Sequence, residues 1–126
     1  MRLLSKFSKS QQSYYTVLLC LEPPKPSSPI TGSASTYSDI NVRYAAVPDF
    51  NGPITGYKIY VEYKIGTGPM RTKIVTTSRK LQETISNLHP YTDHVMRYAA
   101  VNKIGEGPMS DPAAAIKTKE KGELNE

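Results

Sequence analysis

The sequence predicts an all-β fold, a sandwich of two antiparallel sheets with seven strands in all. Apolar and polar residues alternate with a period of two in short runs, as they do in strands with one buried face. These runs recur about every ten residues, and turn-forming residues separate them. Nine Tyr, ten Pro and no Trp also favour strands over helices. Such a pattern over about a hundred residues is typical of an immunoglobulin-like β-sandwich, with a barrel as the alternative.

The clearest predicted strand lies in the middle of residues 88–110. Alternate residues from His94 to Ala100 share one face there, a corner containing Pro90 precedes them, and a glycine-rich loop follows. Residues 54–63 form the longest run of strand-favouring residues, so we predict that they are the central strand. Glu83 falls on the inward face of its strand, which indicates a sheet edge or a bulge. The other predicted strands are residues 30–36, 39–46, 70–77, 81–85 and 113–118.

Three segments of different composition divide the chain. Residues 1–22 are predicted to be a disordered leader or linker, residues 23–118 the folded domain, and residues 119–126 a disordered charged tail. A Pro-rich stretch opens the domain, because proline suits an extended entry segment better than a central strand. The apolar run 14–21 resembles a secretory signal only loosely, since its polar lead-in is long and no cleavage site follows.

The composition restricts the classes of possible partner but identifies no particular partner. A net charge of +5 permits an acidic partner, but nucleic-acid-binding domains usually concentrate more positive charge, so we expect no nucleic acid. Since no apolar run is long enough to span a bilayer, we expect no membrane insertion. The single Cys20 can close no internal disulfide, which leaves the compartment open.

Four groups of residues occur in a characteristic order over residues 23–118. The first is the Pro-rich entry, and the second is the loop and strand P-D-F-N-G-P-I-T-G-Y that begins at Pro48. The third is L-x-P-x-T, beginning at Leu88, and the fourth is A-V-N-x-x-G-x-G-x-x-S, beginning at Ala100. In this order the four groups resemble the fibronectin type III family. The resemblance implies a non-catalytic β-sandwich module. It assigns structural roles to Tyr44, Tyr57, Leu88, Pro90, His94 and Tyr98.

Two positions depart from the family pattern. Tyr44 stands where the family usually has Trp, and His94 stands where it usually has the tyrosine of the corner after Leu88. The Tyr44 hydroxyl therefore needs either a buried partner or access to the surface. Because an imidazole has a shorter reach than a phenol, we expect the corner at His94 to stabilise this domain less than a tyrosine corner would.

No pattern of catalytic or metal-binding residues stands out. His89 and His94 lie five residues apart in the structural corner, and the spacing suggests no third group for a catalytic triad or a metal site. The paired glycines in residues 66–68 and 105–107 do not open a helix, so we interpret them as turns and not as phosphate-binding loops. We expect no enzyme activity, no cofactor and no metal.

The sandwich interpretation places three connections, residues 47–53, 78–80 and 102–109, at one end of the domain. Phe50 and Ile104 would be exposed apolar tips there, and such tips anchor protein interfaces when they cluster. The alternative is that each is an ordinary exposed side chain. The integrin-binding Arg-Gly-Asp tripeptide is absent. The residues predicted to bind a protein partner are Phe50, Asn51, Lys103, Ile104 and Glu106.

A second candidate surface is the outward face of one sheet. We expect four basic side chains to lie side by side there with Tyr60, where they would bind an acidic polysaccharide such as a sulfated glycosaminoglycan. The alternative is a solvated face balanced by Glu62. The four basic residues are Lys58, Arg71, Lys73 and Arg97.

Together these features predict a non-catalytic interaction, adhesion or spacer module, a single fibronectin type III unit of a larger receptor, adhesion or matrix protein. One alternative is an intracellular scaffold unit of a muscle or cytoskeletal giant protein, and another is an accessory module of a carbohydrate-active enzyme. We expect the isolated domain to be monomeric. An extracellular position is favoured over a cytoplasmic one, although no Asn-x-Ser/Thr glycosylation site occurs.

Overall fold

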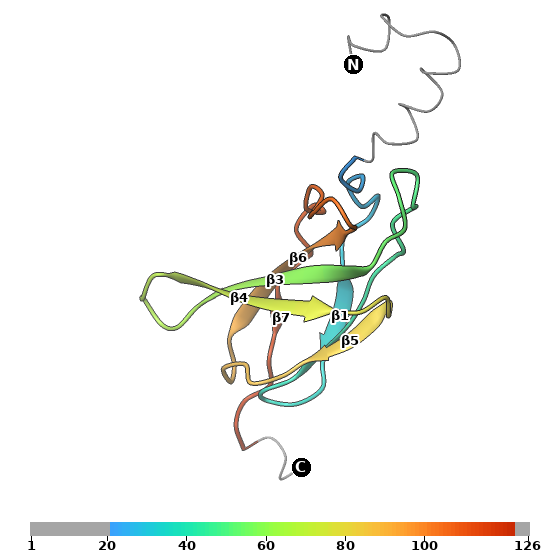
Figure 1. The fold of residues 1–126 in the computed structure, drawn as a ribbon. Helices are drawn as coiled ribbons and strands as arrows, with labels where there is room; N and C mark the ends of the chain where they lie inside the picture. The colour runs from blue at the N-terminus through green and yellow to red at the C-terminus, as the bar shows by residue number, and fades with distance from the viewer. Residues whose placement is uncertain (1–20, 123–126) are drawn as a thin grey trace, which may run out of the picture.

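A computed structural model describes residues 21–122, and the predictions made for residues 1–20 and 123–126 lie outside this part of the chain. Seven strands make up its regular secondary structure (Figure 1). They are β1 (Thr31–Ala34), β2 (Ile40–Arg43), β3 (Gly56–Lys64), β4 (Met70–Thr77), β5 (Gln82–Ile85), β6 (Asp93–Val101) and β7 (Ile116–Lys117).

The strands form two sheets that pack face to face (Figure 1). One has three strands in the order β1-β2-β5, and the other has four in the order β4-β3-β6-β7. Each pairing is antiparallel. The predicted seven-stranded antiparallel sandwich is therefore confirmed, and the barrel alternative is wrong. β3 lies between β4 and β6, which is the inner position predicted for residues 54–63.

The core consists of the residues whose alternation predicted the strands. On β6, His94, Met96, Tyr98 and Ala100 are all completely buried. Ile59 and Val61 of β3 are buried beside them, and Ile40, Val42 and Ile85 cover them from the three-stranded sheet. Burying each large apolar side chain stabilises the fold by about 1.5–3 kcal/mol relative to an exposed position.

The segment after residue 106 forms an irregular edge, and only Ile116–Lys117 of the predicted strand 113–118 has regular pairing. Pro108 and Pro112 have no N–H group to donate. Instead, the N–H groups of residues 107, 110 and 113 donate to the carbonyls of residues 100, 98 and 96. This edge therefore advances three residues for every two residues of β6, so residues 107–113 form no regular strand.

Three tyrosines fill the core near the loop-bearing end of the sandwich. The ring centroid of Tyr44 lies 5.2 Å from that of Tyr57 and 4.9 Å from that of Tyr98. The buried Tyr44 hydroxyl is 3.1 Å from the hydroxyl oxygen of Thr77, so it has the buried partner that the sequence required. The Tyr57 hydroxyl accepts a hydrogen bond from the N–H of residue 47, and the Tyr98 hydroxyl donates one to the carbonyl of residue 45. Three tyrosine rings with hydrogen-bonded hydroxyls thus fill the space that a Trp usually occupies in the family.

Glu83 has the inward orientation that its position in the sequence indicated. It pairs with Val42 of β2, whose side chain is in the core. β5 is the outer strand of the three-stranded sheet, so the half-buried Glu83 lies at a sheet edge, one of the two expected explanations. An inward-pointing charge on an edge strand disfavours pairing with the edge of another molecule.

Candidate interaction surface at the loop end

The antiparallel order brings the N-terminal segment and two loops together at one end of the sandwich (Figure 1). We call residues 21–24, 48–53 and 102–108 the loop end. The turn 78–80 lies at the same end of the strands, because Thr77 at the end of β4 pairs with Tyr57 at the start of β3. All three connections that the sequence placed at one end therefore lie there, and the loop end joins two of them to an entry segment that the sequence did not place there.

Asn102 holds the three segments of the loop end together. Its side-chain oxygen accepts hydrogen bonds from the N–H groups of Ile104 and Gly105 at 2.9 and 3.1 Å. Its side-chain nitrogen donates to the carbonyls of Leu21 and Asn51 at 2.8 and 3.1 Å. The residue is only 5% exposed. These four hydrogen bonds therefore replace the hydrogen bonds to water that the amide loses on burial. In the sequence Asn102 was recognisable only as part of a family motif, and its role in joining the segments was missed.

The loop end carries exposed apolar side chains around a shallow hollow. Phe50 is 83% exposed, and Leu21 and Ile104 are 54% and 55% exposed. The exposure of Phe50 and Ile104 agrees with the sequence prediction, while their part in binding stays a prediction. The hollow is lined by Leu21, Glu22, Pro23, Pro24, Asn51, Ile104 and Pro108.

Leu21 and Glu22, which the sequence analysis assigned to the leader, contribute backbone contacts to the loop end. The Glu22 carbonyl accepts a hydrogen bond of 2.9 Å from the side chain of Asn51, and the Leu21 carbonyl is bound by Asn102. Gly107 passes so close to the Pro23 carbonyl that a β-carbon at this glycine would collide with it. The N-terminal segment therefore belongs to the same surface as the two loops.

Glu106 and Lys103 of the second loop have different surroundings. Lys103 is exposed. Glu106 is half-buried, and its carboxylate accepts a hydrogen bond of 2.5 Å from the Tyr60 hydroxyl and lies 3.5 Å from the ammonium of Lys58. The hydrogen bond to Glu106 is the main cause that raises the pKa of Tyr60 to about 12, and burial adds to it. Glu106 thus fastens the loop to the outer face of the four-stranded sheet.

The four basic residues predicted to share one face do not share it. Residues that pair directly across an antiparallel sheet point to the same side. Lys58 pairs with Ala99, and Arg97 pairs with Tyr60, so both lie on the outer face. Arg71 pairs with Tyr63, and Lys73 pairs with the core residue Val61, so both have the opposite orientation. The prediction of a four-residue basic face is wrong for this reason.

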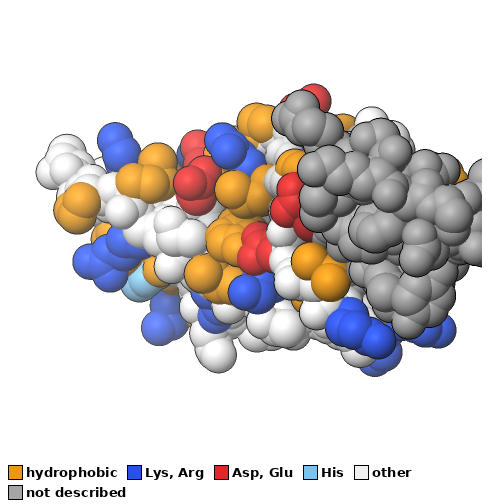
Figure 2. Space-filling model, turned by 45° about the horizontal axis from the view of Figure 1, so that its top comes forward, with side chains coloured by type: hydrophobic (Ala, Val, Ile, Leu, Met, Phe, Trp, Pro, Cys, Tyr) orange, Lys and Arg blue, Asp and Glu red, His pale blue; other side chains and the backbone are white. Residues whose placement is uncertain are grey.

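Three basic side chains of the domain are moreover engaged by other groups. Lys58 approaches Glu106, and Lys73 donates from the edge of the sheet to the Ser86 carbonyl at 2.8 Å. Lys25 bonds to Asp111 at 2.9 Å, and this contact, with a smaller contribution from Arg97, lowers the pKa of the Asp111 carboxyl. Figure 2 accordingly shows basic and acidic side chains interspersed with apolar ones on the face that it presents.

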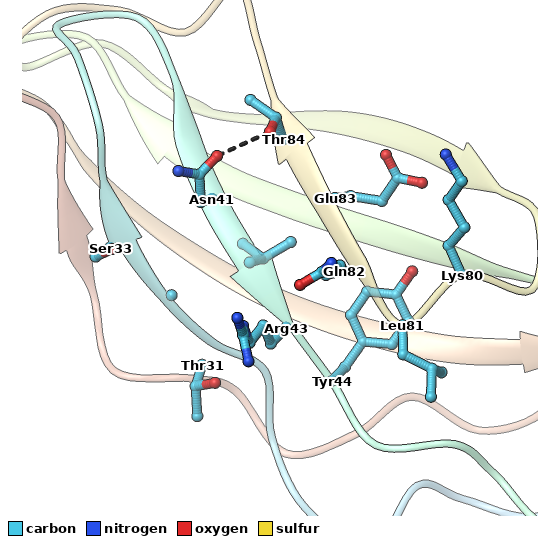
Figure 3. Close-up of a pocket in the computed structure, with 12 residues that line it drawn as sticks. Thr31, Ser33, Asn41, Arg43, Tyr44, Lys80, Leu81, Gln82, Glu83 and Thr84 are labelled. Carbon is cyan, nitrogen blue, oxygen red and sulfur yellow. Dashed lines mark hydrogen bonds between the residues drawn. The ribbon is translucent and has the colours of Figure 1, made fainter.

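Residues of β1, β2, β5 and the turn before β5, most of them of polar types, line a second shallow hollow (Figure 3). Asn41 on β2 accepts a hydrogen bond of 2.8 Å from the hydroxyl of Thr84 on β5. Arg43 lies two residues further along β2, and both Lys80 and Glu83 contribute to the lining. Because cations and an anion line the same hollow, its charges select no particular class of ligand.

The described residues 21–122 contain no group of three or more His, Cys, Asp or Glu side chains placed to hold a metal ion. His89 and His94 both lie near the Tyr63 ring, with centroid distances of 5.6 and 5.3 Å. In this part of the chain, no helix has the length and apolar character needed to cross a membrane.

Fold and surface together define a β-sandwich interaction module, with rigid sheets that present apolar residues on short loops. The chain belongs to the fibronectin type III family, because the family model, described as the fibronectin type III domain, matches residues 22–116. The modules of this family are generally non-catalytic, as the resemblance seen in the sequence implied.

Known proteins with similar domains are much longer than this chain. Contactin-5 of Danio rerio is 29% identical over 82% of the chain, which spans 10% of that protein. A tyrosine-protein phosphatase Lar-like protein of Caenorhabditis elegans is 32% identical over 68% of the chain, which spans 4% of it. The solution structure of the third fibronectin III domain of the human KIAA0343 protein superposes with a TM-score of 0.68 at 22% identity, covering 81% of this chain and 88% of the other. This last likeness concerns the fold alone.

Proposed function

We propose that the chain is a protein-binding module, one fibronectin type III unit of a larger receptor, adhesion or matrix protein, and that it binds its partner through the loop end. The observation that carries this proposal is the group of three strongly exposed apolar side chains, Leu21, Phe50 and Ile104, on segments joined by one buried Asn102. The half-buried Asn51 and the exposed Lys103 supply polar groups beside them. Glu106 acts in this proposal by positioning the loop.

Two physical arguments support the loop end as the binding surface. Interfaces usually gain most of their free energy from a few aromatic or aliphatic anchors, and the exposed Phe50 and Ile104 are side chains of this kind. In addition, the hydrogen bonds of Asn102 and Glu106 fix the loops before a partner arrives. Loops that are already ordered lose less conformational entropy on binding.

The experiment uses the full chain as bait and identifies bound proteins by cross-linking and mass spectrometry. Phe50→Ser and Ile104→Ser are combined in one variant. Ile74→Ser is the matched control, because Ile74 on β4 is 56% exposed, almost the same as Ile104. We expect the double variant to lose a partner that the control variant keeps, with both folded as judged by thermal melts.

A partner retained by the double variant would contradict binding through the loop end. Capture of no specific partner by the natural chain would favour a spacer instead. The sequence on either side of these residues in the natural protein separates the remaining settings. A tandem array of similar modules without a signal would favour an intracellular scaffold, and an adjoining catalytic domain would favour an accessory module.

A further inference from the structure

His94 is a completely buried polar side chain without a partner. It is 0% exposed, and neither ring nitrogen makes a hydrogen bond with any described residue. Burial lowers the pKa of His94, and nearby backbone groups of Ile116 and Thr92 offset only part of this effect. Burying a neutral imidazole costs much less free energy than burying a protonated one, because the protonated ring would place an uncompensated charge in the core.

The charged and titratable groups on the elements around His94 do not supply a counter-ion. They are Tyr63 on β3, Arg71 opposite it on β4, His89 in the corner, Asp93 at the start of β6 and Lys117 on β7. Asp93 favours the protonated form and His89 opposes it, but neither bonds to the ring. Asp93 pairs across the sheet with Lys117, a residue of opposite charge.

His94 is covered by β7, a strand of only two residues. Ile116 of β7 pairs directly with His94. Beyond it, the chain is held to the corner by a small set of hydrogen bonds between residues 89–92 and 117–119, which we call the clasp. The Tyr91 N–H donates to the Lys119 carbonyl at 3.0 Å, the Thr92 N–H to the Thr118 hydroxyl at 3.0 Å, and the Thr118 N–H to the Thr92 carbonyl at 3.1 Å.

We propose that His94 makes the clasp acid-sensitive: its protonation opens β7 and the clasp while the rest of the sandwich stays folded. Opening is the least costly way to hydrate the imidazolium, because β7 has few ladder bonds and lies at the edge of its sheet. An exposed histidine has a pKa of about 6.5. Above that value the closed state is fully favoured, and below it the open state gains population as pH falls toward the lower pKa of the closed state.

The test is site-resolved amide hydrogen exchange on the full chain at pH 7.5 and 5.5, corrected for the intrinsic pH dependence of exchange. Protection at the clasp amides of Tyr91, Thr92 and Thr118 is expected to fall by about tenfold for each pH unit below the exposed value. The amides of Ser110 and Ala113, which lie on the same edge but outside the clasp, should keep their protection from exchange. In His94→Phe the clasp protection should not depend on pH, whereas His89→Gln should behave like the natural chain.

An equal acid response in His94→Phe would overturn the proposal, and so would a uniform loss of protection across β3 and β6. A second measurement keeps the proposal testable if that variant does not fold. NMR titration of the natural chain should show the His94 ring titrating below the ordinary histidine value and in step with the clasp amides. Titration of His94 at or above the ordinary histidine value of about 6.5 would overturn it equally.

Discussion

The Tyr60 hydroxyl donates a hydrogen bond of 2.5 Å to the carboxylate of Glu106, joining the middle of a sheet to the loop that carries Ile104. The bond spans 46 residues of sequence. Since both side chains are partly buried, the contact is less screened than a surface ion pair. It links a rigid strand to the proposed binding surface.

Removing this hydrogen bond should change the pKa of the Tyr60 hydroxyl. In the natural chain the hydrogen bond to Glu106, with a smaller contribution from burial, raises the pKa of the Tyr60 hydroxyl to about 12. In Glu106→Gln we expect the pKa of Tyr60 to move toward the ordinary tyrosine value of 10.0. Ultraviolet difference titration measures this directly, with Tyr60→Phe identifying the signal.

The same bond should affect stability at high pH. Because the folded pKa lies above the unfolded one, the stabilisation is fully present below pH 10 and is lost as pH rises through about 12. We expect Tyr60→Phe to cost about 1 kcal/mol at pH 7, which is less than for a fully buried bond to a charged acceptor because the site is partly exposed. Urea unfolding that gave the same stability for both proteins would count against the bond.

Asn102→Ala should destabilise the domain more than a typical polar substitution. It removes two donors and two acceptor contacts from a buried position and leaves the N–H groups of Ile104 and Gly105 without their partner. We expect a loss of about 2 kcal/mol in the free energy of unfolding. Asn41→Ala is the control, because the exposed Asn41 has one hydrogen bond and should cost less than about 1 kcal/mol. Equal losses in urea unfolding would refute a special role for Asn102.

His94→Tyr should raise the melting temperature. The substitution removes two unpaired ring nitrogens and gives the corner a hydroxyl with a longer reach. A gain of about 1 kcal/mol corresponds to a shift of about 4–8 °C for a domain of this size. His89→Tyr is the control. An unchanged or lower melting temperature would show that the histidine does not weaken the corner.

Lys73 should protect the free edge of β4. Its ammonium reaches from this edge strand to the Ser86 carbonyl after β5, which places a charge beside an otherwise open edge. Lys73→Val should therefore promote concentration-dependent self-association, observed by analytical ultracentrifugation. Thr72→Val, on the opposite side of the same strand, should stay monomeric. Association of both variants alike would mean that added hydrophobicity alone is responsible.

The fold was largely predictable because alternation is a local property. Each face of β3 and β6 could be read from the residues of that strand alone. The last strand was not predictable in the same way, since its pairing depends on where prolines fall relative to the carbonyls of β6. The prediction of a four-residue basic face was wrong because it did not account for the pairing between strands. Arg71 and Lys73 share the side of Val75, and this orientation excludes them from the face that holds Lys58 and Arg97.

The loop end was predictable in part. Phe50 and Ile104 could be placed on loops because proline, glycine and asparagine surround them. The contribution of Leu21 and the bonds of Asn102 involve residues 51 and 81 positions apart. No local pattern reports contacts over such separations. The Pro-rich entry was the one available signal that the N-terminal segment runs along the domain.

The most direct test of the loop end as the binding surface is the footprint of a bound partner, measured by hydrogen exchange on the full chain with and without that partner. Protection should appear at residues 50–53 and 103–108 and leave the outer face of β1, β2 and β5 unchanged. Protection confined to either sheet face, with the loop end unaltered, would contradict the proposed function.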